Sequence, residues 1–169
     1  MIILGLDPGT ALVGWGILDT GVQNRVDGAH CLGYGVISTD KSMTDSQRLL
    51  AVANGLEALL DEYKPGLVSV ERLFFSKNQK TVMTVSQARG VLLYVVERMG
   101  IPMVEFTPQE VKMALTGYGR AEKPQVQKMV QLLLKLPQIP KPDDAADAVA
   151  IALIAAQTQG FRGRASTSV

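Results

Sequence analysis

The chain has 169 residues, of which 47% are apolar and 20% charged, a composition typical of one soluble globular domain with a hydrophobic core. A formal net charge of +1 argues against the strongly basic balance of many nucleic-acid-binding proteins, and a single cysteine, Cys31, excludes an internal disulfide. The chain starts without a basic leader and has no apolar run of membrane-spanning length, so we expect a cytoplasmic protein with no membrane partner.

The near-neutral total hides a strong asymmetry along the chain. Residues 1–71 carry 4 basic and 9 acidic groups, whereas residues 72–142 carry 11 basic and 4 acidic groups. The remaining residues, 143–169, carry 2 basic and 3 acidic groups. A scatter of solvated surface charges is one interpretation, and a basic middle segment that binds an acidic partner is the other.

The first half of the chain predicts three strands, a helix and a fourth strand. Residues 2–7 form an apolar run that stops at Pro8-Gly9, and the β-rich residues 12–19 and 30–38 complete an antiparallel meander. Leucines and valines at helical spacing predict a helix over 44–63, which Pro65-Gly66 ends. Residues 67–71 are a further short apolar run, and it ends on an acid.

The second half predicts one more strand and four helices. Residues 79–99 are apolar nearly all round, which predicts a helix buried on two sides, and 101–106 form the fifth strand. Thr107-Pro108-Gln109-Glu110 is a capping box that opens a short helix to about 115. Further helices are expected at 124–136 and from a cap at Asp143 to about 157.

These elements predict an α/β fold with a mixed five-stranded sheet and helices on both faces. We expect one domain over residues 1–157 and a disordered tail over 158–169.

Four acids are the leading candidates for chemistry. Asp7 and Glu71 end the two most apolar strands, which should lie side by side at the sheet centre, where open α/β sheets bind ligands. Asp144 and Asp147 share one face of the last helix, and alanines around them allow close packing on the sheet. Each acid alone fits a solvated strand end or a helix-dipole partner. As a set they are costly unless something neutralises them.

Clustered carboxylates either hold raised pKa values or bind divalent cations. Their hard oxygens favour Mg²⁺ or Mn²⁺, and a set without His or Cys disfavours zinc. Two such ions about 4 Å apart activate a water and stabilise the leaving oxygen in a phosphodiester displacement. Metal-dependent phosphodiester hydrolysis is therefore the favoured reaction class.

Six segments, taken together, resemble a known family. They are Asp7-Pro8-Gly9-Thr10, Val70 to Phe75 with Lys77-Asn78, Gln87-Ala88-Arg89-Gly90, Gln109 to Lys112, Ala121-Glu122-Lys123, and Asp144 to Ala152. In order and spacing from residue 2 to about 157, they resemble the RuvC-type Holliday-junction resolvases, the crossover junction endodeoxyribonucleases. The resemblance implies a ribonuclease-H-like fold and a homodimer that uses two Mg²⁺ per subunit, replaceable by Mn²⁺.

The implied activity is symmetric nicking of four-way DNA junctions in recombination and repair, which leaves 5′-phosphate and 3′-hydroxyl ends. A RuvA–RuvB branch-migration complex is the implied partner.

By the same resemblance, Asp7, Glu71, Asp144 and Asp147 match the family's catalytic metal-binding acids, and Lys112 and Lys123 match active-site lysines. The third acidic position is His in some members and Asp here, which disfavours a mechanism with a His base. The single histidine, His30, lies in a predicted strand, and we expect it to be structural.

Other basic and aromatic residues are candidates for DNA contacts. Phosphate contacts are expected from Arg72, Lys77, Lys80, Arg89 and Arg120, with Lys128 and Lys141. Phe74 and Phe75 follow Glu71 in a polar segment, and one of them would stack on bases or wedge between them. By the resemblance, that residue is Phe74. The alternative is that both rings fill the core. The helix at 79–99 has a face left over for a dimer, with Met83, Val91 and Tyr94 as candidates.

Three alternative interpretations compete with this one. The string Leu6-Asp7-Pro8-Gly9-Thr10 also resembles the phosphate loop of actin-like ATPases, but those proteins need two such domains. A ribonuclease H acting on RNA–DNA hybrids would have the same fold and the same use of carboxylate-bound metal ions. A junction-binding module without chemistry is the rival of another class, and the four intact acids argue against it.

Overall fold

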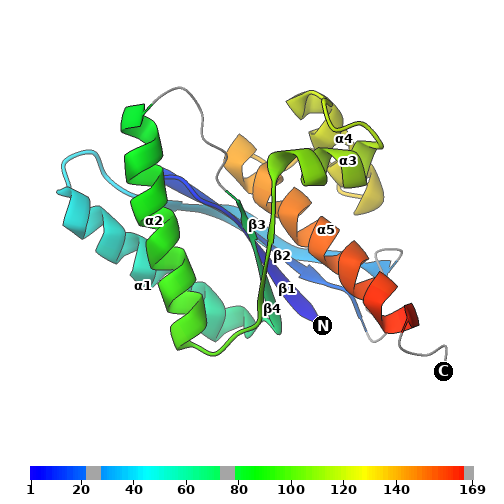
Figure 1. Ribbon diagram of the computed structural model, residues 1–169, viewed down its shortest axis with the longest axis horizontal. Coiled ribbons are helices and arrows are strands. Elements are labelled where there is room, and N and C mark those ends of the chain that lie inside the picture. Colours follow the sequence, from blue (N-terminus) through cyan, green and yellow to red (C-terminus); the bar gives the residue numbers. More distant parts are fainter. Residues whose placement is uncertain (22–27, 73–78, 166–169) are drawn as a thin grey trace.

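The computed structural model describes residues 1–21, 28–72 and 79–165, and within them five strands form one sheet in the order β3-β2-β1-β4-β5 (Figure 1). The strands are β1 (Ile2–Asp7), β2 (Leu12–Asp19), β3 (His30–Ser38), β4 (Leu67–Glu71) and β5 (Met103–Phe106). The first three pair antiparallel, whereas β1 with β4 and β4 with β5 pair parallel. The predicted mixed five-stranded sheet is confirmed, with β1 and β4 adjacent in it.

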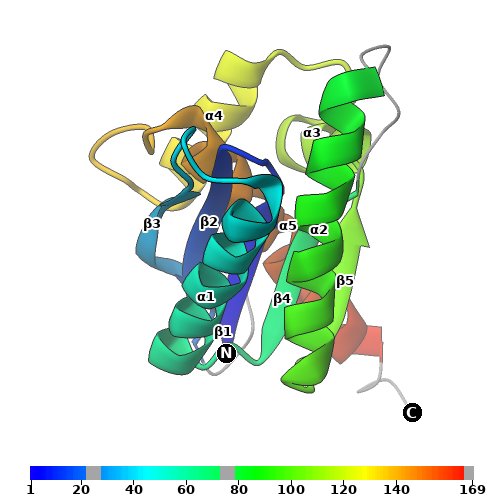
Figure 2. The same cartoon turned by 90° about the vertical axis from the view of Figure 1, so that its left-hand side faces the viewer.

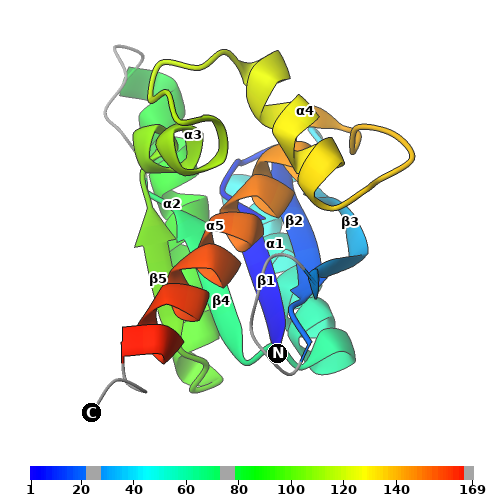
Figure 3. The ribbon, with the colours of Figure 1, turned by 90° about the vertical axis from the view of Figure 1, so that its right-hand side faces the viewer.

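Helices cover both faces of this sheet, as predicted. On one face lie α1 (Asp45–Tyr63) and α2 (Gln79–Arg98), side by side (Figure 2). The other face carries α5 (Asp143–Ala165), with α3 (Pro108–Thr116) and α4 (Lys123–Leu133) packed around its first half (Figure 3). Among the described residues, no helix is both long enough and apolar enough to cross a membrane.

Strand alternation sorts the side chains between two cores. Leu4 and Leu6 of β1 pack with α1 and α2, whereas Ile3 packs with α3, α4 and α5. In β4, Val68 and Val70 join the α1–α2 core, and the hydroxyl of Ser69 donates to the α5 carbonyl of Ile151 at 3.2 Å. Because side chains alternate along a strand, Asp7 and Glu71 belong to the face that α5 covers.

Glycines let α5 lie close to the sheet. A Cβ built on Gly14 would stand 2.0 Å from the carbonyl oxygen of Asp144, and one on Gly5 would stand 2.1 Å from that of Ala148. On the helix side, the alanines at 145, 146, 148, 150 and 152 are all buried. Small residues on both partners therefore fix how near the acidic start of α5 comes to the strands.

Capping residues fix where several of the helices begin and end. The predicted capping box of α3 is confirmed, since Thr107 accepts from the amide of Glu110, and Gly117 ends the helix in a left-handed conformation. A second capping box joins Thr44 to Gln47 at the start of α1. Asp143 was expected to cap α5, but it lies inside the first helical turn, where its carboxylate binds Lys141 at 2.9 Å.

Two expectations are corrected. Helix α2 is not buried on two sides in the single chain, because Met83 and Tyr94 are 70% and 64% exposed while Leu92 and Val96 are fully buried. Helix α5 continues to Ala165, whereas the sequence predicted its end near residue 157. No proline interrupts residues 158–165, and the two glycines there weaken the helix without ending it.

Candidate active site

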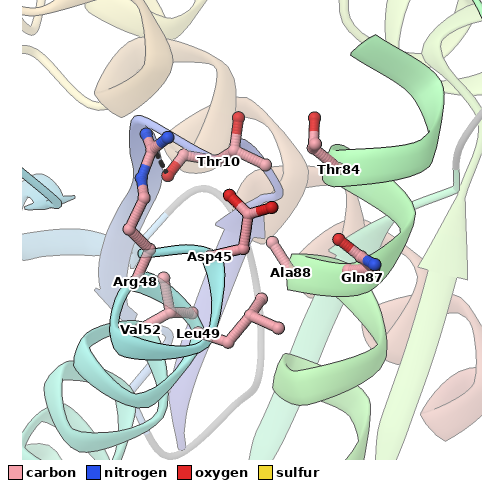
Figure 4. Close-up of a pocket in the computed structure, with 8 residues that line it drawn as sticks. All are labelled: Thr10, Asp45, Arg48, Leu49, Val52, Thr84, Gln87 and Ala88. Carbon is pink, nitrogen blue, oxygen red and sulfur yellow. Dashed lines mark hydrogen bonds between the residues drawn. The ribbon is translucent and has the colours of Figure 1, made fainter. Parts of the chain in front are cut away.

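The turn after Asp7 is held from several sides. A Cβ on Gly9 would stand 2.1 Å from the carbonyl oxygen of Leu12, so only glycine fits there. The carbonyl of Thr10 accepts from the Thr39 hydroxyl at 2.8 Å and from the guanidinium of Arg48 at 3.1 Å. Figure 4 shows this Arg48 contact at the edge of a small pocket between α1 and α2. The Asp-Pro-Gly-Thr segment is thus a rigid turn that fixes where β1 ends.

Asp7 and Glu71 end adjacent parallel strands at the same edge of the sheet. The pairing of Leu6 with Val70 places the two acids side by side, and their carboxyl groups lie within hydrogen-bonding reach of each other. Both side chains are partly buried. The two acids lie next to each other at the end of the sheet, as predicted.

The start of α5 brings two more acids to this edge. Asp144 lies over β2, where its backbone carbonyl faces Gly14, and Asp147 follows one turn later. The bond from Ser69 of β4 to Ile151, one turn beyond Asp147, ties the helix to the central strands. All four predicted acids therefore gather at one end of the sheet.

Burial and the crowding of carboxylates at this edge both shift the pKa of Asp7. Burial raises the pKa of Asp7 well above its usual value, and the charges of Glu71, Asp147 and Asp144 raise it further. Burial also raises the pKa values of Glu71 and Asp147. Negative charge at this edge is thus only partly compensated by the chain itself.

Two lysines supply that partial compensation. Lys123 lies at the start of α4, and its ammonium nitrogen is 2.7 Å from a carboxylate oxygen of Asp147 and 3.8 Å from one of Asp143. Although burial lowers the pKa of Lys123, the neighbouring Asp147, Asp143 and Asp7 raise it overall. The charges of Lys123 and Lys112 both act to lower the pKa of Glu71, so both predicted lysines lie near the acids.

The residues present fit a hard divalent cation. The donors at this edge are carboxylate oxygens with no His or Cys among them, and they retain an excess of negative charge. In the described part of the chain, no three His, Cys, Asp or Glu side chains are already arranged closely enough to hold a metal ion. Lys123 instead makes the shortest contact with Asp147.

Arg89 and Arg72, two of the predicted phosphate contacts, both lie beside Glu105. Arg89 forms an ion pair with Glu105 of β5, and its Nε donates to the backbone carbonyl of Glu71 at 3.4 Å. Arg72 approaches the second carboxylate oxygen of Glu105 at 3.9 Å. Both arginines therefore have an acidic partner within the chain.

The remaining predicted contacts divide into two groups. Arg120, Lys128 and Lys141 are exposed, with Lys128 bonded to Gln131 and Lys141 to Asp143. Phe74, Phe75 and Lys77 lie outside the described residues, as does the side chain of Lys80. His30 is exposed at the start of β3, opposite Asp19 and hence at the far end of the sheet from Asp7.

Three residues of this region were not anticipated from the sequence. Arg48 holds the turn after Asp7, Asp143 shares Lys123 with Asp147, and Glu105 pairs with two arginines. For Glu105 a signal existed, because an acid inside the apolar stretch Met103 to Phe106 needs a partner when the strand is covered.

Comparisons with known proteins identify a family for this chain. The family model for "Crossover junction endodeoxyribonuclease RuvC" matches residues 3–155. A protein of that name from Brevibacillus brevis is 48% identical over 162 residues, which is 95% of each chain. The corresponding protein of Roseiflexus is 49% identical over 152 residues, 89% of this chain and 87% of the relative.

Solved structures give the same result. Thermus thermophilus RuvC in complex with Holliday junction substrate superposes with a TM-score of 0.87 at 30% identity, covering 95% of this chain and 96% of the other. The yeast mitochondrial Holliday junction resolvase Ydc2 shares the fold, with a TM-score of 0.66 at 14% identity over 96% of this chain and 82% of the other.

Proposed function

Since the chain belongs to the RuvC family of crossover junction endodeoxyribonucleases, we propose that it resolves four-way DNA junctions by nicking two strands symmetrically, leaving 5′-phosphate and 3′-hydroxyl ends. It has the ribonuclease-H-like fold that the resemblance implied. The observation that carries the proposal is the position of Asp7, whose pKa is raised by burial and by three further carboxylates at the same sheet edge.

The four acids are proposed to hold Mg²⁺, two ions per subunit, with Mn²⁺ as a substitute. When bound, these ions supply an activated water and stabilise the leaving oxygen of the scissile phosphodiester. Asp7 and Glu71 contribute ligands from rigid strand ends, and Asp144 and Asp147 contribute them from α5. Because a carboxylate must be ionised to bind a cation, the raised pKa of Asp7 favours proton release as cations bind.

The two lysines are proposed to act on the phosphate. Lys123 starts α4 and Lys112 lies on α3, so both reach the acids from outside the sheet. An ammonium fixed beside the scissile group offsets the negative charge that develops on the phosphate oxygens in the transition state. Lys123 is held in place for this role by Asp147 and Asp143.

A homodimer is proposed because a four-way junction presents two equivalent strands to be cut. Of the candidate dimer residues on α2, Met83 and Tyr94 are exposed on the single chain, whereas Val91 packs partly against the core. Large exposed apolar side chains on one helix suit a two-fold contact. A RuvA–RuvB branch-migration complex as a further partner, and a cytoplasmic location beside the chromosome, follow from the family alone.

Substrate preference is the test. The chain is incubated with Mg²⁺ and an immobile four-way junction, a duplex of the same sequence, or an RNA–DNA hybrid of that sequence. The proposal predicts paired, symmetric nicks in the junction and little cleavage of the other two. Preferential cleavage of the hybrid would identify a ribonuclease H instead, and junction binding without any cleavage would identify a binding module.

A further inference from the structure

An acidic residue lies on the α2-covered face of the sheet, opposite the catalytic candidates. Glu105 of β5 pairs in register with Val70, whose side chain belongs to the α1–α2 core. By strand alternation Glu105 therefore faces α2, whereas Glu71 faces α5. Glu105 is 27% exposed, so its carboxylate needs a partner within the protein.

Arg89 of α2 is that partner. Its guanidinium binds one carboxylate oxygen of Glu105, and its Nε donates to the backbone carbonyl of Glu71 at 3.4 Å. The end of β4 is also held on its other side, where the amide of Arg72 donates to the carbonyl of Phe106 at 2.8 Å. The backbone just around Glu71 is thus fixed by Arg89 and by β5 together.

The side chain of Arg89 is poorly placed for a phosphate. It is only 20% exposed, and two of its three guanidinium nitrogens, Nε and Nη2, already have acceptors within the chain. The planar guanidinium fork of arginine can donate to two acceptors at a fixed angle, whereas the ammonium of lysine cannot.

We propose that Arg89, with Glu105, is a positioning residue that sets the orientation of Glu71 for metal binding and catalysis, rather than a contact to DNA. This inference rests on the proposed function, in which Glu71 is a metal ligand. The pair acts through the main chain of Glu71 from the opposite face of the sheet.

A matched control exists on the same helix. Arg98, at the other end of α2, forms an ion pair with Glu57 of α1 and so joins two helices far from the acids. Arg98→Gln therefore removes an arginine–glutamate pair from α2 without touching the end of β4. It measures what the loss of such a pair does away from the acids, together with the loss of the contact between the Arg98 guanidinium and the Tyr94 ring at 5.8 Å.

The experiment compares Arg89→Gln, Glu105→Gln, their double variant, Arg89→Lys and Arg98→Gln. Three quantities are measured: single-turnover cleavage of a saturating junction, junction affinity against salt without divalent cations, and Mn²⁺ affinity by calorimetry without DNA. We expect Arg89→Gln and Glu105→Gln each to lose about 10–100-fold in cleavage and a comparable factor in Mn²⁺ affinity. The double variant should lose no more than either single variant.

Junction affinity and its salt dependence should stay as in the unmodified chain. Arg89→Lys should lose nearly as much cleavage as Arg89→Gln, because lysine keeps the charge but not the fork. Arg98→Gln should leave cleavage and Mn²⁺ affinity unchanged.

Two results would overturn the inference. Weaker junction binding by Arg89→Gln, with a salt slope reduced by about 1 and unchanged Mn²⁺ affinity, would make Arg89 a phosphate contact. Equal losses in Arg89→Gln and Arg98→Gln would reduce the pair to general structural support. If the unmodified chain cleaves no junction, the proposed function fails, and the Mn²⁺ measurement still decides the role of Arg89.

Discussion

Lys123 and Asp147 form the closest charged contact at the acidic edge, with the ammonium nitrogen 2.7 Å from the carboxylate. The two residues come from the starts of α4 and α5. They are 24 positions apart in the sequence, and no local pattern predicts their contact. It gives Lys123 a fixed place beside the acids, where its charge also acts on Glu71. A lysine held in this way is pre-organised for a phosphate that arrives at the same edge.

Lys123→Met should lower single-turnover cleavage of a saturating junction by about 10²-fold, the cost of removing one positioned charge from a transition state. Junction affinity should change little, because other basic residues supply most of the phosphate contacts. Lys128→Met is the control, since Lys128 is exposed on the same helix and bonds only Gln131 among the contacts described. Equal cleavage by the two variants would contradict an active-site role for Lys123.

Asp143→Asn should have a much smaller effect. Asp143 is 3.8 Å from the ammonium of Lys123 and also binds Lys141, but its side chain is 48% exposed. Exposed ion pairs contribute little, so cleavage should fall by no more than about fivefold. A loss as large as that of Lys123→Met would show that Asp143 is itself a ligand or a catalytic group. Single-turnover rates of the two variants under identical conditions make the comparison.

Gly14→Ala should displace the start of α5 from the sheet. Its Cβ would meet the carbonyl oxygen of Asp144 at 2.0 Å, and neither backbone is free to move without shifting the helix. We expect destabilisation by about 1–3 kcal/mol in urea unfolding, together with loss of cleavage. In Gly119→Ala the Cβ meets the Met113 methyl group at 3.5 Å and the Gln109 carbonyl oxygen at 3.8 Å, both ordinary van der Waals contacts, so this control should stay within about 0.5 kcal/mol of the unmodified chain. Unchanged stability in Gly14→Ala would mean that α5 lies further from β2 than described.

The four acids were predictable because two independent sequence patterns point to them. Apolar runs that end on Asp7 and Glu71 mark central strands, and the spacing of Asp144 and Asp147 marks one helix face. Their convergence then follows from the parallel pairing of β1 with β4, which the sequence favoured and the sheet order confirms.

The environment of Arg89 was not predictable in the same way. It depends on the register of β5 against β4 and on the rotation of α2 about its axis, and both are set by packing rather than by local pattern. Helix α2 shows the same limit, because its apolar composition predicts burial but does not say that Met83 and Tyr94 face outward. Composition describes how apolar a helix is, whereas tertiary contacts decide which side is covered.

Asp7→Asn should stabilise the chain in the absence of divalent cations. The pKa of Asp7 is raised by burial and by three neighbouring carboxylates, which means that its ionised form is unfavourable in the folded state. Removing that charge should add about 0.5–2 kcal/mol to the free energy of unfolding at neutral pH with EDTA present. Mg²⁺ should stabilise the unmodified chain and have little effect on the variant. Destabilisation of Asp7→Asn under EDTA would contradict the crowded-carboxylate account.

The most direct test of the metal-dependent nuclease site is the same substitution on junction DNA. Binding and cleavage of a labelled four-way junction are measured for the unmodified chain and Asp7→Asn, each with and without Mg²⁺. The account predicts that both bind the junction and that only the unmodified chain with Mg²⁺ makes the paired nicks. Cleavage by Asp7→Asn at the rate of the unmodified chain would contradict it.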